Sequence, residues 1–213
     1  MSVKSKHEEH TLTARERVLG AAEECFMARG YAAVTLRDIA AAVGIKHTSL
    51  YHHVPGGKEE LFVEVVERSL RRHRRGLRES VQAAAPDLRS RLHAVADWFL
   101  GQGPMDLVRM TQSDLPSLSE EASERLVMQM YESILLPVEA ILRDAYRDGE
   151  TTNPDFGLIS GGLVGMIQSL FSVPDSKVSM SRHEMGRKLI DAFLNGIAAT
   201  PSGVATSPAE SRA

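Results

Sequence analysis

Residues 35–61 constrain the fold of this 213-residue chain more than any other segment. Thr35 followed by Asp38 is a capping-box pattern, which predicts a helix beginning just after Thr35. Apolar residues then recur at helical spacing as far as Gly44, the residue type on which a helix ends in a left-handed turn. A second apolar stripe follows and stops at Pro55. The segment is therefore predicted to be a helix, a turn and a short second helix, the helix-turn-helix motif.

Polar side chains are left on the outward face of the second helix. They are hydrogen-bond donors that are small or flat, so they fit a DNA groove and reach phosphates or base edges. These residues are Lys46, His47, Thr48, Ser49, Tyr51 and His52. Thr35 and Lys58, at the starts of the first helix and of the helix that follows the motif, are expected to contact phosphates. The alternative is an ordinary solvated helix, which the spaced pattern around it disfavours.

These residues divide into expected roles. Lys46 neutralises a phosphate, and Tyr51 is a rigid donor suited to the DNA backbone. His47, Thr48 and Ser49 are expected to read bases, because they lie near the start of the inserted helix. The remaining member, His52, is suited to either role.

The same segment resembles the amino-terminal domain of the tetracycline-repressor (TetR) family of bacterial transcription regulators. The resemblance covers about residues 11–65 and rests on Gly30-Tyr31, Thr35, RDIAAAVGI, SLYHHV and KEEL. It implies DNA contact by the residues named above, a homodimer on a palindromic double-stranded operator, and release by a small effector. Two features depart from the common pattern. Lys46 stands where a small capping residue is usual, and the linker before Lys58 is one glycine longer.

The charge is divided unevenly along the chain. The formal net charge is −3, but residues 1–80 hold 14 Lys/Arg against 11 Asp/Glu, and the remainder is acidic. This fits DNA contact at one end only. A single cysteine is consistent with a reducing compartment, and the amino terminus has no apolar stretch typical of a signal peptide. We therefore expect a bacterial cytoplasmic protein, associated with the nucleoid when it is bound to an operator.

Helical periodicity predicts an all-α fold of about nine helices. The expected organisation is a disordered tail (1–10), a three-helix DNA-binding domain (11–56), a ligand-binding and dimerisation domain (57–198) and a second disordered tail (199–213). The expected helices are 11–29, 35–43, the short one before Pro55, 57–84, one opened by Pro86 and broken after Gly101, a short one to about 111, 119–146 interrupted at Pro137, 155–173 and 182–198. The basic run at 71–75 is interpreted as a solvated face.

A glycine repeat marks residues 156–173, which carry no charge. Gly157, Gly161 and Gly165 recur every four residues, so one helix face lacks side chains and admits a close neighbour. The expected neighbour is 182–198, with a stripe that includes Leu189, Phe193 and Ile197. The resemblance implies that these two helices form the dimer interface; an intramolecular core is the alternative. Flanking aspartates and interior polar residues disfavour a membrane span.

Aromatic and flexible side chains of the second domain are candidates for the lining of an effector pocket. They are Trp98, Phe99, Met105, Met110, Met128, Met130, Tyr131, Met166, Gln168 and Phe171. Such residues suit an apolar ligand, although similar stripes also build cores. Nucleophile, phosphate-loop, zinc and paired-cysteine motifs are missing from the sequence, so neither catalysis, a metal nor a cofactor is expected.

The sequence thus predicts a ligand-responsive, DNA-binding transcription regulator, a repressor in its simplest form. The alternative is a helical ligand-binding or scaffold protein that keeps a helix-turn-helix but has lost sequence-specific DNA binding. Lys46 and the longer linker favour that alternative.

Overall fold

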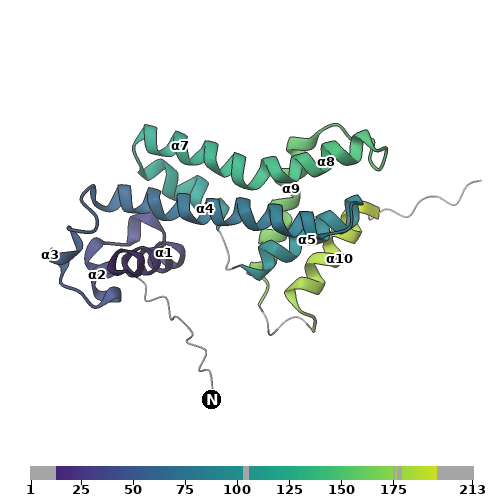
Figure 1. The fold of residues 1–213 in the computed structure, drawn as a ribbon. Coiled ribbons are helices and arrows are strands. Elements are labelled where there is room, and N and C mark those ends of the chain that lie inside the picture. Colours follow the sequence, from purple (N-terminus) through teal and green to yellow (C-terminus); the bar gives the residue numbers. More distant parts are fainter. Residues whose placement is uncertain (1–12, 103–105, 175, 177–178, 196–213) are drawn as a thin grey trace, which may run out of the picture.

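The computed structural model describes residues 13–102, 106–174, 176 and 179–195, and every regular element in these ranges is helical (Figure 1). The α-helices are α1 (Ala14–Ala33), α2 (Leu36–Val43), α3 (His47–Leu50), α4 (Gly57–Ala83), α5 (Leu88–Gly101), α6 (Leu107–Arg109), α7 (Glu120–Met130), α8 (Leu136–Arg147), α9 (Phe156–Ser169) and α10 (Arg182–Asn195). Short π and 3-10 segments are η1 (Met110–Asp114), η2 (Leu115–Ser117), η3 (Tyr131–Leu135) and η4 (Leu170–Ser172). The all-α prediction is confirmed.

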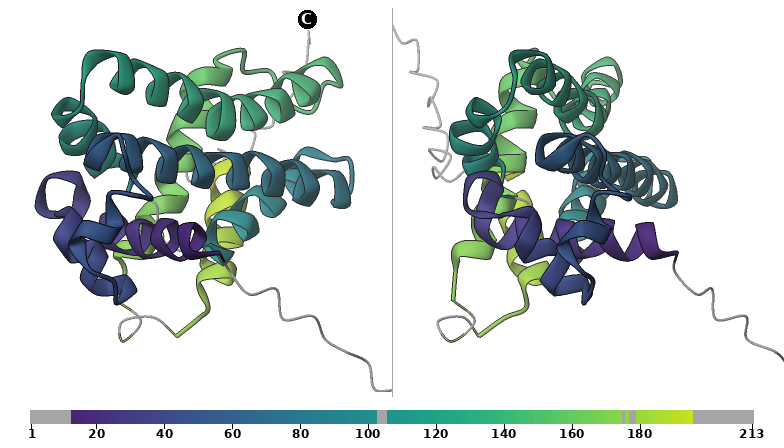
Figure 2. Two further views of the ribbon diagram at one scale, coloured as in Figure 1. Left: turned by 60° about the vertical axis from the view of Figure 1, so that its left-hand side comes forward. Right: turned by 90° about the vertical axis from the view of Figure 1, so that its left-hand side faces the viewer.

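At one end of the molecule α1 packs on α4, α2 packs on α1, and α3 packs on α2 (Figures 1 and 2). Their core contains Phe26, Ile39, Leu50 and Phe62, all of which are fully buried. The rings of Phe26 and Phe62 meet edge to face, with centroids 5.1 Å apart. The sequence predicted that α1 would stop at Gly30. Gly30 does leave helical geometry, with φ at +79°, but a further helical turn continues to residue 33.

The 27-residue α4 connects this end of the molecule to the rest. It is about 40 Å long at a rise of about 1.5 Å per residue. Its amino-terminal half packs on α1 and α7, and α4 also contacts η3, α5 and α8 (Figure 1). One rigid element therefore contacts both the helix-turn-helix and the remaining helices.

The segments α7, η3 and α8 form one continuous rod beside α4 (Figure 2). Pro137 is the second residue of α8 and has no N–H to donate to the carbonyl four residues earlier, which belongs to Ser133. The π segment η3 immediately precedes α8 and absorbs this irregularity. The sequence predicted one helix interrupted at Pro137, and the structure places the irregularity in the turn just before it.

Two glycines bring helices close to α5. A Cβ added at Gly76 of α4 would lie 2.0 Å from the indole of Trp98, so only glycine admits that ring. At Gly186 of α10, an added Cβ would lie 2.5 Å from Leu100. Helix α10 thus packs mainly on α5 and only slightly on α9, so the alternative of an intramolecular core between the last two helices is a minor part of the packing. The contact between α10 and α5 forms because Gly186 of α10 has no side chain to collide with Leu100.

Some predictions fall outside the described residues: the two tails, Met105 and Ile197. In the ranges that the structure does describe, no helix is both long enough and apolar enough to span a bilayer.

Candidate nucleic-acid interface

The turn between α2 and α3 has the geometry that the sequence predicted. Thr35 and Asp38 form a reciprocal capping box at the start of α2. Gly44 ends α2 with φ at +76°, and the Ile45 N–H donates to the Ala40 carbonyl at 3.0 Å. The left-handed Gly44 and the Ile45 hydrogen bond fix where α2 ends. They therefore also set the direction of the chain that leads into α3. Helix α3 spans only His47–Leu50, with turns after it, so it is shorter than the sequence suggested.

The polar side chains of α3 and its flanks lie on the outside. Lys46, Thr48, Tyr51 and His52 are exposed, with Tyr51 at 49%, whereas His47 and Ser49 are half-buried. The rings of His47 and Tyr51 lie edge to face with centroids 5.1 Å apart, which holds the phenol against the start of α3. Lys46 is the N-cap residue but gives no side-chain cap. The structure therefore brings the six predicted residues of this segment onto one surface.

Thr35 is already engaged within α2. Its hydroxyl donates to the Asp38 carboxylate at 2.8 Å and accepts the Asp38 N–H at 3.2 Å. The hydrogen bonds from the Thr35 backbone N–H and then its hydroxyl lower the pKa of Asp38. The Thr35 hydroxyl oxygen therefore stabilises the helix start.

Lys58 lies in the first turn of α4, and its ammonium is 4.1 Å from the ring centroid of Tyr31. This cation–π contact links α4 to the last turn of α1. Burial, followed by the charge of Glu59, raises the pKa of Tyr31. The phenol thus stays neutral beneath Lys58 at physiological pH.

A polar cluster that the sequence analysis missed joins α1 to α6 and η1. Arg109 donates to the carbonyls of Phe26 and Met27 at 3.2 and 2.8 Å, capping the last regular turn before Gly30. Asp114 is 3% exposed and accepts the Tyr31 N–H at 2.8 Å. The Arg109 and Asp114 side chains also form an ion pair at 3.6 Å. The sequence did carry one signal for this cluster: Arg109 and Asp114 have opposite charges and lie five residues apart in a segment with few other charges.

Further contacts connect the end of the molecule that carries α3 to the rod. The Ser119 hydroxyl and N–H at the start of α7 both bond to Glu59, at 2.6 and 3.0 Å, and these bonds lower the pKa of Glu59. Arg15 of α1 pairs with Glu64 of α4 at 2.5 Å. The position of α3 is thus tied to α4, α6 and α7 together.

Comparisons with known proteins agree with this geometry. The family model of bacterial regulatory proteins of the tetR family matches residues 18–65. The regulator LmrA of Bacillus subtilis is 44% identical over 52 residues, which are 24% of this chain and 28% of LmrA. PfmR of Thermus thermophilus, a TetR-family regulator, is 27% identical with a TM-score of 0.68, covering 86% of this chain and all of PfmR. Residues 18–65 therefore match the tetR family model, and the whole chain is similar in fold to a TetR-family regulator.

Several of the similar solved structures are transcription regulators, and some of them were solved with ligands. AibR, solved with isovaleryl coenzyme A and operator DNA, aligns with a TM-score of 0.69 at 16% identity, over 84% of this chain and 96% of AibR. At that identity the likeness concerns the fold alone. The curated match to LmrA spans little more than a quarter of that regulator, so it describes the DNA-binding end only.

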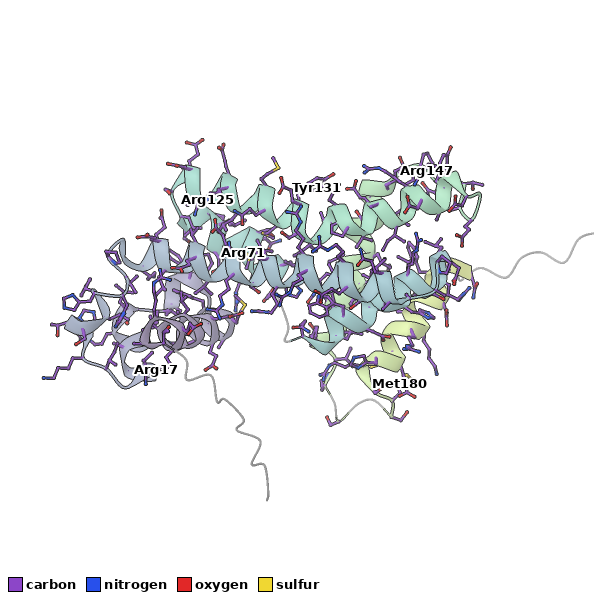
Figure 3. The ribbon with its side chains drawn as sticks, viewed as in Figure 1. Arg17, Arg71, Arg125, Tyr131, Arg147 and Met180 are labelled. Carbon is purple, nitrogen blue, oxygen red and sulfur yellow. The ribbon has the colours of Figure 1, made fainter. Side chains whose placement is uncertain are left out.

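The residues first expected to line an effector pocket differ in burial and lie on several elements. Phe99 and Met110 are fully buried in the core, whereas Met128 and Tyr131 are exposed on the rod (Tyr131 is labelled in Figure 3). The half-buried members are Trp98, Met130, Met166, Gln168 and Phe171, and they are spread over four elements. Trp98 donates to the buried imidazole of His73 at 3.3 Å. An effector pocket lined by these residues stays a prediction, and the buried members among them complete helix contacts.

The glycine face of α9 points away from the rest of the chain. Gly157, Gly161 and Gly165 are exposed, and an added Cβ at Gly161 or Gly165 would meet nothing within 4 Å. Leu158 beside them is 77% exposed. On α10, Phe193 is 38% exposed and Leu189 is half-buried. Within the described chain, therefore, no neighbouring side chain fills this face.

Proposed function

We propose that this protein is a ligand-responsive transcription regulator that binds a palindromic operator as a homodimer and represses transcription. The exposed polar surface of α3, on a turn fixed by Gly44, is the observation that carries the proposal. Lys46, Lys58 and Tyr51 contact the DNA backbone, and Thr35 at the start of α2 contacts a phosphate. His47, Thr48 and Ser49 read base edges, with His52 beside them. In this proposal residues 11–56 read DNA, and 57–198 bind effector and partner.

The homodimer forms through α9 and α10. Exposed glycines allow a second backbone to approach α9 closely, and Leu158 and Phe193 supply apolar area at its edges. Two copies related by a twofold axis place their α3 segments in successive major grooves, about 34–36 Å apart or slightly more. The protein acts in the cytoplasm, on the nucleoid.

Effector binding acts through α4. The carboxy-terminal half of this helix contacts α5 and α8, and its amino-terminal end carries Lys58 and supports α3. A ligand with unequal affinity for two dimer shapes shifts their populations, and the shape with mismatched α3 spacing leaves the operator.

Selection of genomic DNA fragments on the purified protein, read by sequencing, tests this proposal. We expect one palindrome, recovered by wild type and by Tyr131→Ala but lost with Tyr51→Ala. Tyr131 is the matched control, because it is also exposed and lies on the rod. Affinity for the palindrome should fall steeply with salt, since each phosphate contact releases counterions.

A lack of enrichment after any bound ligand has been removed would favour the alternative: a helical ligand-binding or scaffold protein without sequence-specific DNA binding. The observation that supports this alternative is the missing side-chain cap at Lys46, the N-cap residue of α3. Equal recovery of the palindrome by Tyr51→Ala would refute the docking of α3.

A further inference from the structure

A groove of about 540 Å³ lies between the carboxy-terminal half of α4, the start of α5 and α8. None of the residues first expected to bind effector lines it. Leu77 and Ile141, both buried, form its floor, and Val81 and Pro137 add apolar wall. The volume falls in the range of small-molecule sites, about 300–1,000 Å³. The groove is thus large enough for a metabolite-sized ligand and has an apolar surface to receive it.

Positive charge surrounds this apolar floor. Arg74 and Arg78 of α4 and Arg91 of α5 line the groove, against one carboxylate, Asp144. Asp144 pairs with Arg91 at 3.3 Å and also with Arg147, so its charge is shared.

The two arginines of α4 are weakly neutralised. The only ion pair of Arg74 within the described residues is with Glu132 at 3.9 Å, and both side chains are largely exposed. No carboxylate in the described part of the chain lies within ion-pair distance of Arg78. Like charges four residues apart on a helix repel each other by a few tenths of a kcal/mol. A bound anion would relieve this repulsion.

We infer that this groove binds a small amphiphile with an anionic head, a carboxylate or a phosphate, and that this molecule is the effector of the regulator proposed above. The guanidinium groups of Arg74 and Arg78 hold the head, because their paired N–H donors match carboxylate and phosphate oxygens. The apolar part lies on Val81, Pro137 and Ala140, which cover the buried Leu77 and Ile141. The assignment as effector rests on the proposed function; the binding of the amphiphile does not.

Two dyes with one skeleton separate the charge from the apolar surface. 8-Anilinonaphthalene-1-sulfonate carries an anionic head, and N-phenyl-1-naphthylamine lacks it. In fluorescence titrations of the full chain, Arg74→Gln/Arg78→Gln should weaken binding of the sulfonate dye by roughly tenfold or more, since charged hydrogen bonds are lost. Binding of the neutral dye should stay within about twofold. Ala140→Trp, which fills the groove, should abolish binding of both.

The matched control is Arg71→Gln/Arg75→Gln, which removes the same charge from the same helix. Both residues lie outside the groove and pair with acids on α4 (Arg71 is labelled in Figure 3). Equal loss of sulfonate-dye affinity in this control would overturn the inference, because a general charge effect would then suffice. Unchanged binding of both dyes by Ala140→Trp would overturn it too. Circular dichroism checks that each variant is folded.

Competition with decanoate, decyl phosphate and decanol identifies the head group. The two anions should displace the sulfonate dye, and the better of them indicates the source of the natural ligand. Displacement by decanol at equal concentration would contradict the inference. Operator binding without amphiphile is measured separately, so a failed groove and a failed regulator give different results. If dye binding follows the expectation but amphiphile leaves operator binding unchanged, the groove is a binding site for anionic amphiphiles. Its proposed role as the effector site is then contradicted.

Discussion

At the scale of single residues, His73 is the most unusual position of the chain. It lies in the middle of a basic run that the sequence analysis assigned to solvent, yet only 3% of its surface is exposed. Its imidazole accepts the Trp98 indole N–H and stacks on Phe99 at a centroid distance of 5.6 Å. Burial, followed by the charge of Arg72, lowers the pKa of His73 to about 4. The side chain is therefore a neutral part of the core at physiological pH.

This burial predicts acid sensitivity well above the range in which carboxylates titrate. The folded-state pKa lies below the ordinary value of 6.5, so the folded protein binds fewer protons. The resulting stability is complete above pH 6.5 and is lost as the pH falls towards 4. The loss should reach about 3 kcal/mol, at about 1.4 kcal/mol per pKa unit. Urea unfolding followed by far-ultraviolet circular dichroism from pH 7 to 4.5 measures it.

His73→Gln is the control, because glutamine keeps an acceptor for Trp98 but does not titrate. Its free energy of unfolding should change much less over the same pH range. An equal fall in both proteins would assign the acid sensitivity to other groups.

At the scale of elements, the end of α1 depends on charges supplied by α6 and η1. Asp114→Ala should lower the free energy of unfolding by about 2–4 kcal/mol, because it leaves Arg109 unpaired and the Tyr31 N–H without an acceptor. Asp114→Asn should lose less, since its carbonyl oxygen can still accept that N–H. Urea unfolding of the two variants at pH 7 provides the comparison. Equal losses would indicate that the hydrogen bond to α1 is unimportant.

The same elements show how far the sequence could predict this structure. Caps, glycines and periodicity are local signals, and they located α2, its turn and the ends of α4. Partners across the fold are not local: nothing around Arg109 indicates that its guanidinium reaches Phe26. The burial of the expected pocket residues could not be predicted for the same reason, because an apolar stripe does not show whether a cavity or another helix faces it. The groove was missed because Arg74 and Arg91 come together only when α4 meets α5 and α8.

At the scale of the whole molecule, the exposed glycine face predicts how dimer and monomer can be separated. Gly161→Arg should give a folded monomer, because its Cβ meets no atom within 4 Å inside the chain and arginine favours a helix more than glycine does. Gly20→Arg on α1 is the matched control, with equally open surroundings. Analytical ultracentrifugation should find only the control and wild type dimeric. A dimeric Gly161→Arg protein would place the interface elsewhere.

The missing side chain at Gly76 also gives this chain an internal optical sensor. Trp98 is its only tryptophan, and the glycine lets the indole lie directly against the backbone of α4. Any tilt or slide of α4 must therefore change the surroundings of that ring. Emission from the unlabelled protein should shift in wavelength or intensity whenever α4 moves. The shape change that the proposed regulator undergoes with ligand or DNA can thus be timed in a stopped-flow instrument without attaching a dye.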